Sequence, residues 1–287
     1  MSANEFVTQY LEGTQRLTDA YGYNPAEGSD SCGVGLVVAL DGKRRRDVVV
    51  AGIDALKAVW HRGAVDADGK TGDGAGIHVE IPQDFFKEYI RDSSGQDVQG
   101  GRVAVGTVFL PRTDLGAQER CRIIVEAEIL RAGHQILGWR QVPVDISVIG
   151  EKANATRPEI EQILIGRGDP KLDNREFEKQ LYILRRRMEK AAIAENIAEF
   201  YVCSLSCRSL IYKGMFLAEH LSAFYPDLLD ERFVSRFAIF HQRYSTNTFP
   251  QWKLAQPFRV LAHNGEINTI LGNVNWMKSH EARLDHE

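Results

Sequence analysis

Short stretches of alternating or continuously apolar residues recur along the whole chain, and most are bounded by glycine, proline, asparagine or aspartate. Such stretches are typical of β-strands that bury one face or both. They predict strands at residues 34–40, 77–81, 101–110, 141–148, 201–205, 209–212, 237–241 and 260–263. A further strand is predicted at 48–50, across a hairpin turn at Asp41-Gly42.

Apolar residues recur at helical spacing between several of these strands. This pattern predicts helices at residues 54–60, 117–132, 174–198 and 267–283. A weaker helical pattern runs through Phe6, Tyr10, Leu11 and Leu17 near the start of the chain. Strands that follow one another through turns, with helices inserted between them, predict an α+β fold rather than regular βαβ winding.

Composition narrows the class of protein. The chain has 287 residues, of which 44% are hydrophobic and 26% charged, as is usual for a globular protein. A net charge of −4 does not favour nucleic-acid binding, and we interpret the basic run at 43–46 as the solvated tip of the hairpin. The sequence lacks both an apolar run of about 18 residues and a signal-peptide pattern. We therefore expect a cytoplasmic protein that does not enter a membrane.

The glycine-rich segment Thr71-Gly72-Asp73-Gly74-Ala75-Gly76 precedes a predicted strand. Dinucleotide-binding folds need the reverse order, in which a strand leads into the glycines and a helix follows them. We therefore interpret these glycines as a loop that lets backbone segments pack closely beside a pocket.

Cys32 lies in the small-residue turn Ser31-Cys32-Gly33-Val34-Gly35, directly before a predicted strand. A cysteine at a new N-terminus can use its own α-amine as the base for a thiol nucleophile, because that amine has a pKa of about 7.7–8.0. This chemistry would require the removal of residues 1–31. From the local sequence alone, a buried small residue in a tight turn is the more common interpretation of such a cysteine.

Two later motifs could complete an amide-cleaving site. In Asn264-Gly265, a side-chain N–H and a backbone N–H could converge on one oxyanion, although Asn-Gly is also a common simple turn. Arg243 and Thr246 follow the strand at 237–241 and could bind a carboxylate, although an arginine at a strand end more often forms a surface ion pair.

Metal binding is the other chemistry that the sequence raises. Cys203 and Cys207 are spaced so that they would face the same side of a strand, and eight histidines lie elsewhere. No second pair has the spacing of a zinc site, so we expect both cysteines to pack as small apolar residues and predict no metal site. The four cysteines are too few for a disulfide framework and fit reduced thiols.

Taken together, the motifs resemble those of the class II glutamine amidotransferase domains, a family of N-terminal-nucleophile hydrolases. They include Cys32-Gly33-Val34-Gly35, His61-Arg62-Gly63, the glycine-rich segment, the run at 241–250 and His263-Asn264-Gly265-Glu266. The extended motif through Met277, with Gln242 and Phe249-Pro250, resembles the large subunits of glutamate synthases more than other amidotransferases. These motifs occur in the order that the family has, over nearly the whole chain.

The resemblance implies a four-layer αββα sandwich of two stacked antiparallel sheets. It also implies that Cys32, freed by cleavage of the Ser31-Cys32 bond, forms a γ-glutamyl thioester and serves as its own α-amine base. Asn264 and Gly265 would form the oxyanion hole. Arg243 and Thr246 would bind the α-carboxylate of glutamine, and Arg62 and Gly63 would line the pocket.

The resemblance further implies that ammonia passes to a synthase site that makes glutamate from 2-oxoglutarate. That site, with its FMN and iron–sulfur cluster, would lie in other domains of the same chain, and a small electron-donating subunit or ferredoxin would supply electrons. The family binds the substrate's α-ammonium with an acidic residue beyond the Asn-Gly pair, and Asp285 comes too early to match it. We therefore expect residues 32–287 to be an amidotransferase domain truncated at its C-terminal end. An unprocessed, catalytically silent regulatory or scaffolding module is the alternative.

Overall fold

A computed structural model describes residues 3–21, 33–98, 101–243, 249–260 and 270–283. The chain divides into two compact units, Met1–Cys32 and Gly33–Glu287. The described part of the first unit is the helix α1 (Ala3–Tyr21), within which Val7, Tyr10 and Leu11 are exposed. The helix predicted near the start of the chain is therefore confirmed.

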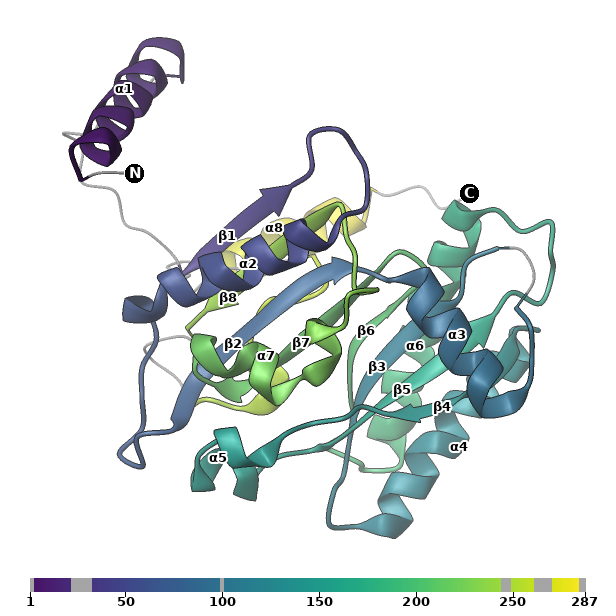
Figure 1. Cartoon of the computed structure of the whole chain (residues 1–287). Helices are drawn as coiled ribbons and strands as arrows, with labels where there is room; N and C mark the ends of the chain where they lie inside the picture. The colour runs from purple at the N-terminus through teal and green to yellow at the C-terminus, as the bar shows by residue number, and fades with distance from the viewer. Residues whose placement is uncertain (1–2, 22–32, 99–100, 244–248, 261–269, 284–287) are drawn as a thin grey trace. The chain divides into compact units, whose positions relative to one another are not determined.

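The second unit contains a first antiparallel sheet with the strand order β1-β8-β2-β7 (Figure 1). Its strands are β1 (Val34–Val38), β8 (Phe237–Gln242), β2 (Thr71–Glu80) and β7 (Ser209–Phe216). Val34 pairs with His241, and Gly76 pairs with both His241 and Lys213. The first and the last strands of the described fold are therefore neighbours in this sheet.

A second antiparallel sheet has the order β4-β5-β3-β6. Its strands are β4 (Gln135–Gln141), β5 (Glu159–Gly166), β3 (Ala104–Leu110) and β6 (Tyr201–Ser206). A tight turn joins β6 to β7 and so connects the two sheets. The Gln162 side-chain amide of β5 also donates to the Tyr212 hydroxyl of β7 at 3.2 Å, which links the sheets through buried side chains.

Helices cover the sheets on their outer sides. Helix α2 (Arg46–Ala58) lies against β8 and β1, while α4 (Leu115–Arg131) and α6 (Asn174–Ala194) pack on each other and on the second sheet. Both α4 and α6 begin at an aspartate whose side chain accepts backbone N–H bonds of the first turn, namely Asp114 and Asp173. The remaining described helices are α3 (Gln83–Ser94), α5 (Glu151–Ala155), α7 (Leu221–Phe224) and α8 (Ile270–Glu281).

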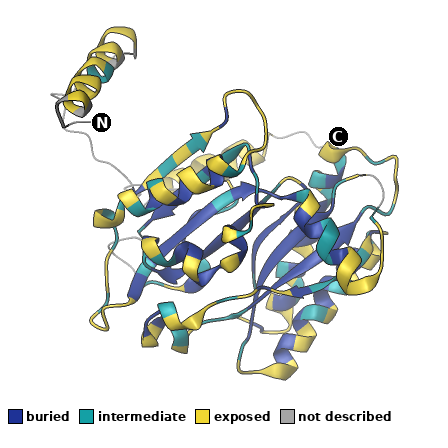
Figure 2. Cartoon of the chain, in the orientation of Figure 1, coloured by how far each residue is buried: buried dark blue, intermediate teal, exposed yellow. Residues whose placement is uncertain are grey.

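Two hydrophobic cores hold these layers together. One contains apolar side chains of α2, of the first sheet and of the inner face of the second sheet, whereas the other lies between the second sheet and the α4–α6 pair. Figure 2 shows that the central strands are largely buried and that the helices expose their outer faces. The predicted α+β fold, with two antiparallel sheets flanked by helices, is confirmed.

Several predicted elements differ from the observed ones. Residues 48–50 belong to α2 and not to a strand, because Val49, Ile53 and Leu56 form one helical face that packs on the sheet. The glycine-rich segment is the first half of β2 rather than a loop, since it pairs with β7 and β8. Residues 141–148 contain only the end of β4 and a short 3-10 turn. The prediction omitted α3 and β5. It also placed a strand at residues 260–263, but residues 261–263 lie outside the described residues.

The basic run at 43–46 is not the tip of a hairpin. It leads into α2, and its arginines have specific partners: Arg44 lies 3.5 Å from Glu80, and Arg46 donates to the carbonyls of Leu228 and Phe233. Cys203 and Cys207 also differ from expectation, because they lie in different cores rather than on the same side of a strand. Among the described residues, no helix is both long and apolar enough to cross a lipid bilayer.

Candidate active site

Three of the seven predicted site residues, Arg62, Gly63 and Arg243, belong to the described parts of the chain. Cys32, Thr246, Asn264 and Gly265 lie outside the described residues. The geometry of the candidate site therefore comes from the residues that flank them.

Three motif-bearing segments meet at the beginning of β1: the one that follows Cys32, the turn with Arg62 and Gly63, and the end of β8 at Gln242. The backbone N–H of Gln242, at the end of β8, donates to the carbonyl of Gly33 at 2.6 Å. A Cβ atom at Gly33 would lie 3.3 Å from the Cβ of Arg62, so the 3-10 turn Trp60–Arg62 is packed against the same point. Residues that are far apart in sequence thus surround the residue that directly follows Cys32.

The glycines of β2 allow backbone segments to approach this region closely. Gly74 has a φ of 131°, which favours glycine, and its carbonyl accepts a hydrogen bond from the N–H of Arg243 at 2.9 Å. A Cβ at Gly76 would lie 2.5 Å from the carbonyl oxygen of Gln256 and 2.8 Å from that of Tyr212. The interpretation of these glycines as close-packing positions is confirmed, although they lie in a strand.

Two adjacent residues at the end of β8 carry an energetic cost. Arg243 has a φ of 96°, a conformation that costs a residue with a side chain about 1–3 kcal/mol. Gln242 is only 1% exposed, and its Oε1 has no hydrogen-bond partner among the atoms of the described residues. Such an unpaired buried oxygen costs about 1–3 kcal/mol. Costs of this kind concentrate at functional sites.

A buried lysine supports the segment that covers the glycines. Lys213 of β7 pairs with Gly76, and its Nζ donates to the carbonyl of Lys253 at 2.8 Å. The Nζ also lies 4.7 Å from the ring centre of Tyr201 and 4.6 Å from that of Phe258. Burial lowers the pKa of Lys213 to about 8.

The three described cysteines are poor nucleophiles. Cys121, Cys203 and Cys207 are all buried and not disulfide-bonded. Burial raises the pKa of Cys121 to about 11 and the pKa values of Cys203 and Cys207 to about 12. Since the thiolate is the reactive form, these thiols are inert near neutral pH. Any thiol chemistry in this chain therefore rests on Cys32.

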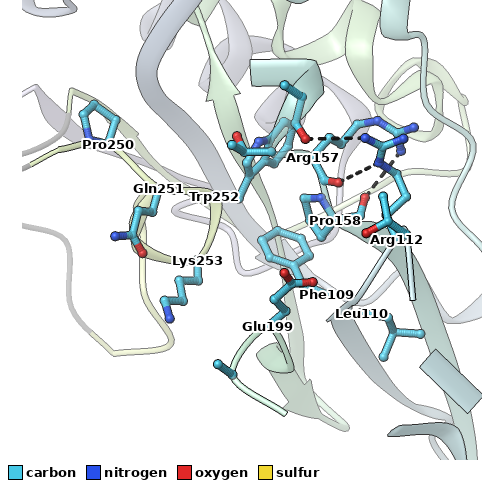
Figure 3. A pocket seen from close by; sticks show the side chains of 14 residues that line it. Phe109, Leu110, Arg112, Arg157, Pro158, Glu199, Pro250, Gln251, Trp252 and Lys253 are labelled. Atoms are coloured by element: carbon cyan, nitrogen blue, oxygen red, sulfur yellow. Dashed lines mark hydrogen bonds between the residues drawn. The ribbon is translucent and has the colours of Figure 1, made fainter. Parts of the chain in front are cut away.

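One cavity has Pro250 of the 241–250 run in its lining, and no other motif residue among the described ones. It has a volume of about 450 Å³, and Figure 3 shows Arg112 and Arg157 at one side of it with Trp252 and Lys253 on the other. Arg112 donates to the carbonyls of Arg157 and Asn154, so it ties loops together. The lining of the cavity contains no cysteine, serine or histidine among the described residues, and it contains none of Arg62, Gly63 and Arg243. We therefore do not take it as the catalytic site.

Comparison with known proteins decides the family. Residues 32–287 match the profile of the class II glutamine amidotransferases, and that match begins at Cys32. The chain belongs to the class II glutamine amidotransferases. The amidotransferase fold found here is accordingly that of the N-terminal-nucleophile hydrolases, with the motif-bearing segments gathered at the start of β1.

The amidotransferase resembles the large chains of glutamate synthases. It is 64% identical to the glutamate synthase [NADPH] large chain of Azospirillum brasilense over 98% of this chain and 18% of that protein. It is 44% identical to the chloroplastic ferredoxin-dependent glutamate synthase of Spinacia oleracea over 88% of this chain and 16% of that protein. It is also 42% identical to the glutamate synthase [NADPH] large chain of Bacillus subtilis, over 92% of this chain and 17% of that protein. The chain thus spans about a sixth of the length of these relatives.

The sequence did not indicate a role for two buried residues near the motif-bearing segments. Gln242 belongs to the motif that resembles glutamate synthases, and Lys213 lies within β7. The sequence does offer a clue to the burial of Lys213, because a charged residue stands there within an otherwise apolar strand. The importance of Gln242 is visible only from its contact with Gly33 in the structure, because a polar residue at the end of a strand is common in any sequence.

Proposed function

We propose that this amidotransferase hydrolyses L-glutamine to glutamate and ammonia through a γ-glutamyl thioester on Cys32. The observation that carries the proposal is that the Arg62-Gly63 turn and Gln242 meet at Gly33, while the neighbouring Arg243 is bonded to Gly74 of β2. An amide-cleaving enzyme must gather a nucleophile, a proton acceptor and substrate-binding groups at one point. The family match from Cys32 onwards supports this assignment.

Maturation comes first in this mechanism. Hydrolysis of the Ser31-Cys32 peptide bond removes residues 1–31 as a propeptide and frees the α-amine of Cys32. The boundary between the units Met1–Cys32 and Gly33–Glu287 lies one residue after this bond, which supports a division of the chain close to Cys32. The amine, with an ordinary pKa of about 7.7–8.0, takes the proton of the thiol as the sulfur attacks.

Each later step assigns a group to a role. The sulfur of Cys32 bonds to the amide carbon of glutamine, and the negative charge on the oxygen is held by the side-chain N–H of Asn264 and the backbone N–H of Gly265. The intermediate collapses as the α-ammonium returns its proton to the leaving nitrogen, which departs as ammonia. Water then attacks the thioester, so that glutamate leaves and the thiol is restored.

Two residues that follow β8 in the sequence orient the substrate. Arg243 binds the α-carboxylate of glutamine through its planar guanidinium, assisted by the hydroxyl of Thr246. The unusual φ of Arg243 and its bond to Gly74 fix where its side chain starts. Arg62 and Gly63 line the side of the pocket next to Gly33.

We further propose that the ammonia serves a synthase site elsewhere in a longer protein, where it is combined with 2-oxoglutarate. The relatives that support this include both NADPH-named and ferredoxin-dependent glutamate synthases. FMN and an iron–sulfur cluster would belong to that other part. The described thiols do not suit a cluster, because Cys203 and Cys207 are buried in different cores and protonated. The free buried thiols fit a reducing compartment, which we propose is the cytoplasm.

Three measurements on the purified protein test the proposal. Mass spectrometry should find Cys32 as the first residue, ammonia should be released from glutamine, and a diazoketone analogue of glutamine should label Cys32. Cys32→Ala should abolish both ammonia release and labelling, whereas the control Cys121→Ala should retain them, because that thiol is buried and protonated. An unprocessed N-terminus without ammonia release would instead establish a silent module, and labelling of another cysteine would refute the mechanism.

A further inference from the structure

The side chain of Gln242 is packed directly against Gly63. A Cβ atom at Gly63 would lie 1.8 Å from the Nε2 of Gln242 and 2.9 Å from its Cδ, so a side chain at position 63 would displace the Gln242 amide. The backbone of Gly63 has φ −82° and ψ 160°, values that any residue adopts easily. The glycine at position 63 is therefore needed for the room that it leaves to the Gln242 amide, and not for its conformational freedom.

The backbone of Gln242 holds a second segment. Its N–H donates to the Gly33 carbonyl at 2.6 Å, and a Cβ at Gly33 would lie 2.1 Å from the Gln242 carbonyl oxygen. Gln242 also pairs with Ala75 of β2, so it is held on its other side by the centre of the sheet. One residue thus contacts the start of β1 through its backbone and the Arg62-Gly63 turn through its side chain.

The chemistry of this side chain shows that it is more than filler. An apolar side chain of similar size would fill the buried space without leaving an oxygen that lacks a partner among the described residues. Its amide end also lies beside the turn that the proposed mechanism places in the pocket.

We propose that Gln242 is a positioning residue for glutamine hydrolysis, which sets the distance between the Arg62-Gly63 turn and Gly33. This inference rests on the proposed function, because Gly33 directly follows the nucleophile Cys32. A shift of the turn relative to Gly33 moves the pocket wall relative to the sulfur. Misplacement of a bound substrate by about 1 Å lowers the rate of the chemical step by up to about 100-fold.

A double-mutant cycle between Gly63→Ala and Gln242→Ala tests the proposal in the purified protein. Each single change should lower kcat for ammonia release by between about 10-fold and 100-fold, with little change in KM, because orientation rather than binding is lost. Since both changes act on one contact, the double variant should be no slower than the slower single variant. Losses that multiply would show that the two residues act separately and would overturn the proposal.

Two controls separate this role from others. Each variant is assayed at a temperature at which circular dichroism shows it to be fully folded, so that a lower melting temperature does not enter the comparison. The rate of Cys32 alkylation by iodoacetamide should stay close to that of the unmodified protein, because the thiol itself is unchanged. Activity that falls only in proportion to the folded fraction would reduce Gln242 to a structural role. If the unmodified protein releases no ammonia, the proposed function fails; if it is active and both single variants match it, only the positioning role fails.

Discussion

Replacing the buried Lys213 by methionine should stabilise the protein near neutral pH. Lys213 is 1% exposed, and among the described residues its ammonium forms no ion pair with a carboxylate. Its described polar contacts are the carbonyl of Lys253 and the hydroxyl of Tyr201, and two aromatic rings flank it. Methionine is unbranched, one heavy atom shorter than lysine and uncharged, and its sulfur packs well against aromatic rings.

The magnitude follows from the pKa of Lys213, which burial lowers from 10.5 to about 8. Each unit corresponds to about 1.4 kcal/mol, so keeping this lysine charged in the folded state costs about 3 kcal/mol. The unfolded chain binds the proton more tightly than the folded one between pH 8 and 10.5, so the free energy of unfolding rises with pH across that window. Below pH 8 the full cost is present.

The comparison therefore changes sign with pH. At pH 7, Lys213→Met should gain about 3 kcal/mol from the lost charge and lose about 1 kcal/mol with the hydrogen bond, a net gain of about 2 kcal/mol. Near pH 10.5 the lysine of the unmodified protein is neutral in the fold, so the variant should be less stable by about 1 kcal/mol. Urea unfolding followed by circular dichroism at several pH values between 7 and 10.5 measures this difference.

The difference between the two proteins isolates Lys213 from other titrating groups. Burial raises the pKa values of Cys121, Cys203 and Cys207, so these thiols lower stability as pH rises above their unfolded value of about 9. They are present in both proteins and cancel to first order. The exposed Lys171→Met is the matched control, which removes a lysine from the surface and should change the free energy of unfolding by less than about 0.5 kcal/mol. A gap between Lys213→Met and the unmodified protein that stays constant with pH would refute the reasoning.

Two further predictions concern buried contacts of the fold. Asp227→Asn should lower the free energy of unfolding, measured in urea, by about 3–5 kcal/mol, because it breaks the bidentate pair with the buried Arg140 at 2.6 and 2.7 Å. The exposed Asp41→Asn is the control and should change that free energy by no more than about 0.5 kcal/mol. An equal loss in both variants would contradict the argument. Gly76→Ala should lower the melting temperature by several degrees, because the new Cβ meets two backbone oxygens that can retreat only if β7 and the Gln256 segment move. A melting temperature equal to that of the unmodified protein would show that these segments yield freely.

Much of the fold follows from local patterns. The predicted strands at 201–205, 209–212 and 237–241 and the helices at 117–132 and 174–198 correspond to observed elements. In each, local preference and tertiary packing agree, as for α6, where Phe177, Leu181, Leu184 and Met188 form one buried face.

The prediction errors occur where local preference and tertiary packing disagree. The run Val48-Val49-Val50 has strand-forming residues, but the spacing of Val49, Ile53 and Leu56 is helical, and burial of that face against the sheet decides the outcome. The glycines of β2 have weak strand preference and are extended because neighbouring strands pair with them. Such pairing with distant residues is not visible in a local window.

The candidate site divides in the same way. Residue types and motif order predicted Arg62, Gly63 and Arg243, and the structure brings their segments together around Gly33. The contact between Gln242 and Gly63 was not predictable, because it depends on the side-chain direction at the end of a strand and on the path of a separate turn. The roles of all seven predicted site residues, Cys32, Arg62, Gly63, Arg243, Thr246, Asn264 and Gly265, remain predictions.

The pairing of β1 with β8 has a consequence for synthesis of the chain. In the described sheet β1 is an edge strand whose neighbour is β8, and Val34 pairs with a residue that is made about 200 positions later. At about 5–20 residues per second, a ribosome needs about 10–40 seconds to make that segment. Until then the nascent strand after Cys32 lacks its partner. If the proposed cleavage before Cys32 requires this pairing, the proposed propeptide stays attached until almost the whole domain has been translated, and maturation would then report completed folding.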